Sequence, residues 1–406
     1  MKIGIYQTYW GRVGGGQRFI AVVAEFLART HDVEIVHHTQ GFLRESVEEA
    51  MQVDLYAVQF RYVPPIDRPN WPTSHPLRRL RLERNLGREI SEPYDLFIDS
   101  SDIPPFFNHA PKGALLIHFP LVTFEEYHAH TSENWKKQSM PQRWLKGMFH
   151  RHEWQQRFAT YDLCMVNSQF TKGWIKQLWG LDASVVFPPL RDGLNPRPKR
   201  PTILSIGAIR GAQHKKQAVM LECFKSLCDG GLKGWRYVMM GACSTSAEDQ
   251  DALKRLRASA AGYPIEICSD VSGSELKQGL ESSSILWHSM GFGVDAAREP
   301  RRMEHFGMVA TEAMSAGCVP VVFNGGGLRE IVTHGKTGFL WSTPEELQQH
   351  TLQLTSDEKL RRGISAAAVQ DSQHYAGPAF ERRLQAALQP LLNPTTSQAT
   401  LQKLSL

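Results

Sequence analysis

Short apolar segments alternate with helical segments along this chain, and this alternation limits its fold more than any other feature. In the first half, apolar segments of a few residues are followed by stretches with apolar residues at helical spacing, such as Ile20, Val23, Ala24 and Leu27 within residues 17–29. Short apolar strands joined by helices are typical of a parallel sheet covered on both faces. The strands expected in this half are residues 2–6, 33–36, 96–98, 114–117, 163–166 and 185–187.

A second series of the same kind follows a break at residues 188–198, where prolines and a glycine interrupt the pattern. Two doubly wound, Rossmann-like α/β domains are therefore expected, since 406 residues exceed what one hydrophobic core usually serves. The strands expected in this half are residues 202–207, 237–241, 265–268, 285–288 and 319–323. The predicted organisation is a first domain over 1–192, a second over 193–375, a C-terminal helix returning to the first domain over 376–393, and a disordered tail over 394–406.

The composition is that of a soluble globular protein and excludes several functions. A formal net charge of +5 favours an anionic ligand or surface but is too diffuse for nucleic-acid binding, so no nucleic acid is expected. The six cysteines lack metal-ligand spacing, which predicts reduced thiols in a cytoplasmic protein. We expect no signal peptide, because the chain starts directly with a strand, and no membrane span, because no apolar run approaches about 18 to 20 residues.

Two glutamates, Glu304 and Glu312, flank the start of a predicted helix in the second half of the chain. They lie eight positions apart (312 − 304 = 8). Gly307 can adopt backbone angles closed to other residues, and the apolar residues 309–316 predict a helix that Gly317 ends. The free N–H groups at this helix start would point at an anionic ligand, with one carboxylate before the helix and another one turn inside it.

The residues around this helix carry a family resemblance. The order E-x-F-G-x-x-x-x-E-A-M-x-A-G-C-V-P-V-V, followed by G-G-x-x-E-I-V and G-x-T-G-F-L, resembles the donor-sugar half of glycosyltransferase family 4. The resemblance implies the GT-B fold, with two Rossmann-like domains facing across a cleft, and a nucleotide-diphosphate sugar donor used with retention of configuration. It further implies that Glu304 positions sugar hydroxyls, that Glu312 binds the ribose, and that Phe306, Gly307 and Met308 bind the donor.

Two basic residues, Arg210 and Lys215, follow the strand expected at residues 202–207. Ligands of open α/β sheets bind beyond the carboxyl ends of the strands, and two cations there suit a diphosphate. A solvated basic turn is the alternative. In the resemblance both residues fall where family 4 enzymes hold the donor diphosphate, although Arg210 lies farther from Gly207 than the family's arginine usually does.

The N-terminal half offers a glycine run and a histidine. Gly15 and Gly16, just before the helix at residues 17–29, would let the backbone approach phosphate or sugar closely, with a structural tight turn as the alternative. In the family this loop faces the cleft, and Gln17 stands where an acid is common. His118 directly follows the strand expected at residues 114–117. A lone histidine is more often structural than catalytic. Family 4 enzymes, however, commonly have a histidine at this place that reaches the hydroxyls of the donor sugar.

Segments 117–120, 166–171, 177–179 and 185–189 resemble one branch of the family, the mannosyltransferases that extend the lipid-linked oligosaccharide for asparagine glycosylation, together with related bacterial group 1 glycosyltransferases. This branch favours GDP-mannose as donor and a glycan or lipid-linked acceptor. Ser168 would line the cleft or, equally, cap a helix. His288 and Gly291, in a W-H-x-x-G-F-G run shared with similar bacterial members, are expected to line the donor site, with a plain strand-to-loop exit as the alternative.

No metal or other cofactor is expected. Asp249 and Asp251 match the D-x-D metal motif of the other large glycosyltransferase fold only superficially, because they lie in an acidic patch at a helix start, where the macrodipole favours carboxylates without metal. No other cluster of His, Cys and Asp predicts a metal site. The residues expected to act in catalysis are Glu304, His118, Lys215 and Arg210.

Residues 77–88 and 143–151 mix cations with large apolar side chains, as helices in a membrane interface do. Surface helices with leucine and tryptophan packed inward are the alternative. Because the N-terminal half receives the acceptor in the family, we expect peripheral contact with the inner face of the membrane and a lipid-borne acceptor.

These features together predict a metal-independent, retaining glycosyltransferase. Two other functions fit the same pattern. One is different GT-B sugar-phosphate chemistry, namely a phosphorylase, a nucleotide-sugar hydrolase or an epimerase. The other is a sugar-binding protein without turnover, although the presence of both Glu304 and Glu312 beside Lys215 favours an enzyme.

Overall fold

The computed structural model describes residues 1–8, 10, 14–64, 76–124, 126, 140–211 and 215–392, and it divides into two compact units. Unit 1 comprises Met1–Phe187 and the chain from Glu381 onward, and unit 2 comprises Pro188–Phe380. The tail expected over 394–406 lies outside the described residues.

The unit boundaries differ by a few residues from those suggested by the sequence. The chain enters unit 2 after Phe187, not after residue 192, because the segment that follows is bonded to unit 2. The backbone N–H of Leu190 donates to the carbonyl oxygen of Tyr375 at 2.8 Å. The C-terminal helix is tied to unit 1 by the ion pair between Glu381 and Arg29 at 2.6 Å.

Unit 1 contains a parallel sheet, and its described strands are β1 (Lys2–Tyr6), β2 (Asp32–His37), β3 (Val58–Tyr62), β4 (Leu96–Asp99), β5 (Lys112–Ile117), β6 (Leu163–Val166) and β7 (Ser184–Val185). Their order is β3-β2-β1-β4-β5-β6-β7. The helices are α1 (Gly15–Ala28), α2 (Arg44–Met51), α3 (Pro76–Ser91), α5 (Met140–Phe158), α6 (Gln169–Trp179) and, from Glu381 onward, α14 (Gly377–Leu392). β3 was not predicted, because its exposed Gln59 and half-buried Arg61 interrupt the apolar run, as the edge of a sheet permits.

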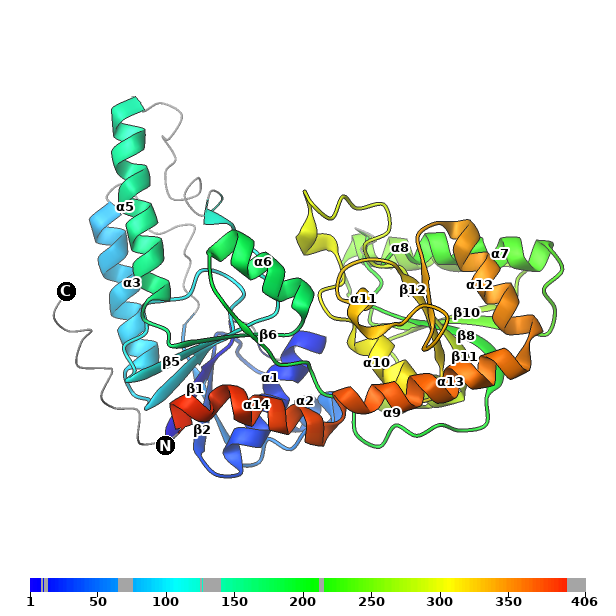
Figure 1. Cartoon of the computed structure of the whole chain (residues 1–406), viewed down its shortest axis with the longest axis horizontal. Helices are drawn as coiled ribbons and strands as arrows, with labels where there is room; N and C mark the ends of the chain where they lie inside the picture. The colour runs from blue at the N-terminus through cyan, green and yellow to red at the C-terminus, as the bar shows by residue number, and fades with distance from the viewer. Residues whose placement is uncertain are drawn as a thin grey trace. The chain divides into compact units, whose positions relative to one another are not determined.

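Unit 2 contains a second parallel sheet with the order β10-β9-β8-β11-β12-β13. The short edge strand β13 was not predicted. Figure 1 shows α7, α8 and α12 on one face of this sheet and α9, α10 and α13 on the other, as in a doubly wound fold. The strands are β8 (Arg200–Ile206), β9 (Arg236–Gly241), β10 (Ile265–Ser269), β11 (Ser283–His288), β12 (Val319–Phe323) and β13 (Phe339–Trp341). The helices are α7 (Gln217–Asp229), α8 (Ala247–Ala260), α9 (Gly273–Ser282), α10 (Met308–Ser315), α11 (Leu328–Ile331), α12 (Pro344–Ser356) and α13 (Glu358–Ser372).

The central strands are apolar on both faces, as expected for parallel sheets covered by helices on each side. In unit 1, Ile3 and Ile5 of β1 lie opposite Val33 and Ile35 of β2, and all four are fully buried. Each such side chain contributes about 1.5–3 kcal/mol to folding. Within the described residues, no helix is long and apolar enough to cross a membrane.

Helices α3 and α5 of unit 1 are joined by a buried ionic cluster. The guanidinium of Arg157, which is inaccessible to solvent, pairs with Glu83 of α3 and with Glu153 at 2.6 Å. It also donates to the carbonyl oxygen of Pro105 at 3.0 Å. Buried charges are tolerated only when they are paired in this way. The cluster therefore holds α3 and α5 side by side, as Figure 1 shows.

Candidate functional site

A cluster of three predicted residues forms at the carboxyl end of the unit 2 sheet. The ammonium of Lys215 lies 2.7 Å from Glu304 Oε2, and Nε2 of His288 lies 3.0 Å from the same oxygen. Ser289, which the sequence did not single out, donates its hydroxyl to the carbonyl oxygen of Lys215 at 2.8 Å. A Cβ added at Gly207 would lie 3.0 Å from Lys215 Cγ, so a glycine there leaves room for the lysine side chain.

The charges in this cluster are set by burial and by the pairing. Burial alone would raise the pKa of Glu304, but the Lys215 ammonium and the His288 hydrogen bond outweigh it and hold this pKa far below its ordinary range. Burial lowers the pKa of His288, and the neighbouring carboxylate offsets this only in part. Glu304 is therefore ionised, and a neutral His288 donates to it through Nε2.

The loop that carries Glu304 is fixed by the glycines that follow β12. The N–H of Gly327 donates to the carbonyl oxygen of Glu304 at 2.8 Å. A Cβ at Gly326 would lie only 2.1 Å from that oxygen, and the φ of Gly326 is +59°. Only glycine allows such a close approach with a positive φ. The sequence contained the glycine run but gave no indication that it supports Glu304.

The start of α10 lies three residues after Glu304, at Gly307. Gly307 has a φ of +115°, and no side chain caps the helix, so its first N–H groups lack a capping partner from the N-cap residue. Met308 is half-buried at this start. The side chain of Phe306 is buried against Tyr375, with ring centroids 5.6 Å apart, so only its backbone could face a donor.

Glu312 is buried inside α10, where its Oε1 lies 3.5 Å from Nε of Arg191. Arg191 belongs to residues 188–198, the proline-rich break between the two series of strands. The pairing of these two residues could not be read from their positions in the chain. Gly291, after β11, has a φ of +95°, and a Cβ there would lie 2.9 Å from Met303 Cε.

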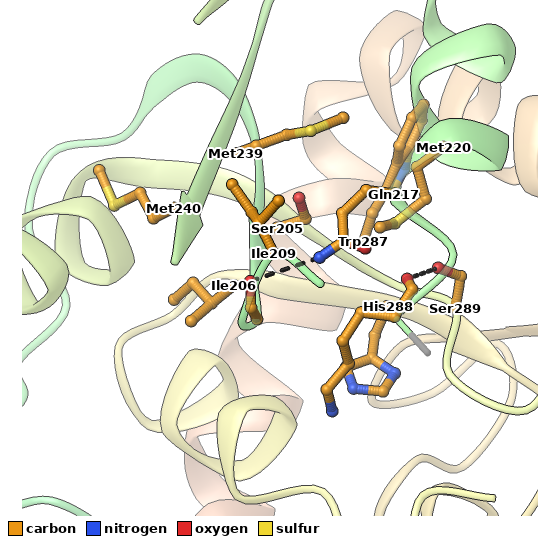
Figure 2. A pocket seen from close by; sticks show the side chains of 12 residues that line it. Ser205, Ile206, Ile209, Gln217, Met220, Met239, Met240, Trp287, His288 and Ser289 are labelled. Atoms are coloured by element: carbon orange, nitrogen blue, oxygen red, sulfur yellow. Dashed lines mark hydrogen bonds between the residues drawn. The ribbon is translucent and has the colours of Figure 1, made fainter. Parts of the chain in front are cut away.

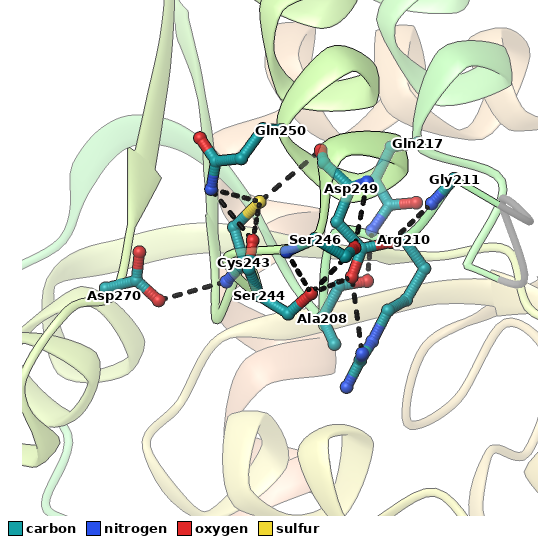
Figure 3. A network of polar contacts seen from close by, with 10 residues as sticks. All are labelled: Ala208, Arg210, Gly211, Gln217, Cys243, Ser244, Ser246, Asp249, Gln250 and Asp270. Carbon is teal, nitrogen blue, oxygen red and sulfur yellow. Dashed lines mark hydrogen bonds and ion pairs between the residues drawn. The ribbon is translucent and has the colours of Figure 1, made fainter.

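Arg210 is not part of the Lys215 cluster. Its guanidinium lies 3.3 Å from Asp249 Oδ2 at the start of α8, within the polar network that Figure 3 shows. Asp249 also accepts from Ser244 Oγ at 2.6 Å and from the N–H of Gly211 at 2.8 Å, and these bonds lower its pKa. Asp251 pairs with Arg255. Both carboxylates of the D-x-D sequence thus have protein partners, and the described residues contain no cluster able to hold a metal.

A small cavity lies beside the cluster, lined by Lys215, Trp287, His288 and Ser289 among others (Figure 2). Its volume of about 10 Å³ is room for one water molecule, not for a sugar. This cavity by itself is therefore too small to be the predicted donor site.

In unit 1, His118 at the end of β5 meets Gly16 in the first turn of α1. Nε2 of His118 lies 3.2 Å from the carbonyl oxygen of Gly16, and Nδ1 lies 3.2 Å from Oδ2 of Asp102. Both partners are acceptors, so both ring nitrogens donate when the ring is protonated. Burial opposes this, but Asp102 outweighs it and raises the pKa of His118. Asp102 was missed because nothing in the sequence placed it beside this histidine.

Two further predictions from unit 1 have different outcomes. Gly15 and Gln17 lie in the first turn of α1, whose N-cap residue Gly14 makes no side-chain capping bond. Ser168, in contrast, is fully buried, and its hydroxyl accepts from the N–H of Thr171 at 3.0 Å. Ser168 is thus the N-cap of α6, which is one of the two roles that the sequence left open for it.

The pairing of His118 with Asp102 generates a prediction about pH. In Asp102→Asn the amide oxygen can still accept from the backbone N–H of His118, but the charge is lost, so burial dominates and the pKa of His118 falls. Because the pKa of His118 is higher in the folded protein than its unfolded value of about 6.5, protonation of the ring stabilises the fold. This stabilisation is complete below the unfolded pKa and disappears as the pH rises through the folded pKa. The variant should therefore lose more stability near pH 6 than near pH 9.

The check is an NMR titration of the histidine Cε1–H signals together with urea unfolding at both pH values. Asp182→Asn, which removes an exposed carboxylate paired with Lys176, is the matched control. An unchanged pKa of His118 in the Asp102 variant would refute the pairing.

Comparison with known proteins identifies the family. The model described as "Glycosyltransferase Family 4" matches residues 13–191, and the model described as "Glycosyl transferases group 1" matches residues 187–371. Among curated proteins, the chain is 28% identical over 253 residues to GDP-Man:Man(3)GlcNAc(2)-PP-Dol alpha-1,2-mannosyltransferase of Dictyostelium discoideum, covering 57% of this chain and 48% of that protein. The human protein of the same name is 26% identical over 232 residues, covering 51% of this chain and 44% of its own length. The matches thus span about half the length of these relatives.

Solved structures share the fold. HepE of Anabaena, in complex with UDP and glucose, superimposes with a TM-score of 0.67 at 15% identity and covers 96% of this chain and 99% of its own. WaaG, a glycosyltransferase involved in lipopolysaccharide biosynthesis, gives a TM-score of 0.60 at 14% identity and covers 96% and 99%. The expected class, two Rossmann-like α/β domains of the GT-B fold, is confirmed. The two family models together cover residues 13–371, and the chain belongs to the group 1 glycosyltransferases of family 4.

Proposed function

We propose that the protein transfers a sugar from a nucleotide-diphosphate donor to an acceptor hydroxyl, with retention of anomeric configuration and without a metal ion. The observation that carries this proposal is the cluster of Lys215, ionised Glu304 and neutral His288 just before the uncapped start of α10. A cation and free backbone N–H groups are what a departing diphosphate requires.

The proposed chemistry follows from where charge develops. As the bond between sugar and diphosphate breaks, negative charge gathers on the phosphate oxygens. Lys215 has three N–H donors, and its contact with Glu304 uses one, so two remain for the phosphate oxygens. The first N–H groups of α10, at the positive end of the helix dipole, stabilise the same negative charge. Glu304 holds Lys215 in place and accepts from sugar hydroxyls. We name no covalent nucleophile, and the acceptor attacks from the face that the diphosphate leaves.

For donor and acceptor, the names of the curated relatives offer one choice. They describe transfer of mannose from GDP-mannose to a dolichyl-diphosphate-linked oligosaccharide. We therefore propose GDP-mannose as donor and a lipid-linked glycan as acceptor. His118, with its raised pKa, is proposed to bind a sugar hydroxyl or phosphate oxygen through Nε2, which then exchanges its 3.2 Å contact with the carbonyl oxygen of Gly16 for the ligand.

A lipid-borne acceptor fits an apolar stripe on α5. Met140, Trp144 and Met148 follow one another at intervals of four residues, so they share one helix face, and they are 79%, 68% and 52% exposed. Large apolar side chains exposed along one face mark an interaction surface. We propose that this stripe attaches unit 1 to the surface of a bilayer.

The first prediction from this proposal separates the two glutamates. Glu304→Gln should lower kcat by about 100-fold or more, because it loosens the cation that stabilises the leaving diphosphate. Glu312→Gln should raise KM for the nucleotide sugar with a smaller change in kcat, because bonds to the ribose act equally in ground and transition states. Steady-state kinetics with GDP-mannose measures both, and the exposed Glu358→Gln is the control. Near-normal turnover in both glutamate variants would end the proposal.

The second prediction concerns metal ions. Turnover should survive EDTA, because Lys215 and the start of α10 provide the positive charge for the diphosphate. The measurement is turnover of the dialysed protein with and without chelator. A loss that magnesium or manganese restores would contradict metal independence while leaving glycosyl transfer in place.

The third prediction concerns the membrane. The double variant Trp144→Ser with Met148→Ser should bind vesicles of phosphatidylcholine and phosphatidylserine at least roughly tenfold more weakly, because each large apolar side chain contributes about 1.5–3 kcal/mol when fully buried. Vesicle co-sedimentation at low salt measures this. The pair Leu43→Ser with Leu352→Ser removes exposed apolar residues elsewhere and should have no effect. Equal binding by both double variants would exclude the α5 stripe as the attachment site.

A further inference from the structure

A hollow of about 490 Å³ lies in unit 1 between α3 and the loop that precedes β5. Its lining includes Arg81, Arg84 and Arg88 from α3, and Phe107, Asn108 and His109 from the loop. The three arginines are spaced by three and four residues, which places them on one face of the helix. The volume is in the range of ligand pockets in proteins.

Positive charge outnumbers negative charge around this hollow, where the carboxylate of Glu92 acts on His109 against the guanidinium groups of Arg84 and Arg88. Among the described residues, none of the three guanidinium groups has a carboxylate within ion-pair distance. Arg84 lies over the ring of Phe107, 4.8 Å from its centroid, and makes one long hydrogen bond of 3.4 Å to Gln156. Three like charges on one helix face repel one another. An anion in the hollow would remove this repulsion and use the free N–H donors.

His109 adds a second observation. Its Nε2 is buried and has no hydrogen-bond partner in the described part of the chain, while its backbone N–H is held by Ser91 Oγ at 2.8 Å. A buried polar atom without a partner costs free energy, and in native proteins such an atom often marks a missing ligand or water. Burial is the main cause that lowers the pKa of His109, and the positive charges of Arg88 and Arg84 add to it, while the carboxylate of Glu92 and a hydrogen bond to the backbone of Arg84 offset part of the lowering.

The hollow is separate from the candidate site. His109 lies three residues before β5 begins at Lys112, whereas His118 directly follows the end of that strand at Ile117. Six residues of β5 therefore separate the two, roughly 20 Å of extended chain. The hollow opens at the amino end of the sheet, where substrates of doubly wound folds do not bind.

We propose that this hollow is a second ligand site, and that it binds a phosphate group carried by a phospholipid head group or by a small soluble compound. Phosphate is the favoured anion because its oxygens can accept from several guanidinium groups at once. In addition, two N–H groups of one planar guanidinium can donate to two oxygens of the same phosphate. The proposal stands on unit 1 alone and does not depend on the proposed transfer reaction.

The test measures binding to the full-length protein by calorimetry. The probes are inorganic phosphate and dihexanoyl phosphatidic acid, with dihexanoyl phosphatidylcholine, a zwitterionic phosphodiester of zero net charge, as the comparison. We expect saturable binding of inorganic phosphate, of phosphatidic acid or of both, and a Kd at least tenfold weaker in the triple variant Arg81→Gln, Arg84→Gln, Arg88→Gln. The exposed set Lys233→Gln, Arg255→Gln, Arg362→Gln removes the same charge from unit 2 and should bind normally.

A separate variant tests whether the probes bind at the proposed donor site instead of the hollow. Lys215→Gln should bind the probes as the unmodified protein does. Loss of binding in Lys215→Gln, with normal binding in the triple variant, would place the anion at the donor site and overturn the proposal. So would the absence of saturable binding, or equal weakening by both triple variants.

The probes also distinguish the two sources of phosphate. Equal affinity for inorganic phosphate and phosphatidic acid supports a soluble ligand, and at least tenfold tighter binding of phosphatidic acid supports a lipid head group. Binding of GDP-mannose to the α3 triple variant is measured in parallel. It reports on the proposed transfer reaction independently, so the two proposals can fail separately.

Discussion

The carboxylate of Glu304 is ionised in a largely buried place, and the local structure of unit 2 is arranged around this charge. A buried carboxylate is tolerated only if cations and hydrogen-bond donors surround it. Lys215 and His288 supply these from the segment before α7 and from the end of β11. The glycines after β12 hold the backbone of Glu304 from the other side. One buried charge thus brings together three segments that are far apart in the sequence.

The two histidines at strand ends have opposite electrostatic surroundings. His288 is buried beside a cation, so it is neutral and serves as a hydrogen-bond donor to Glu304. His118 lies between a carboxylate and a carbonyl oxygen, which together favour the protonated ring. The same residue type at equivalent ends of two parallel sheets can therefore differ in charge, and its neighbours decide which form is present.

The direction of the strands organises unit 1. All the strands of its sheet are parallel, so the carboxyl end gathers the glycine run and His118, while the amino end gathers the loop of Phe107 to His109. Because Arg157 joins α3 to α5, the arginine face of α3 is held against that loop as part of a rigid pair of helices. The proposed phosphate site and the proposed substrate site of unit 1 therefore lie at opposite ends of the sheet.

The sequence by itself determined the α/β class, the central strands and the identity of Glu304, Lys215, His288 and His118 as residues at strand or helix ends. These features depend on local apolar periodicity and on motif order, which are visible along the chain. The edge strands β3 and β13 were not visible, because an edge needs little apolar surface.

Only the tertiary structure decided which side chains meet. It paired Asp102 with His118 and Arg191 with Glu312, turned Arg210 toward Asp249, and buried Ser168 as a helix cap. Distances between side chains from different strands and loops set pairing and protonation, and no spacing in the sequence encodes those distances.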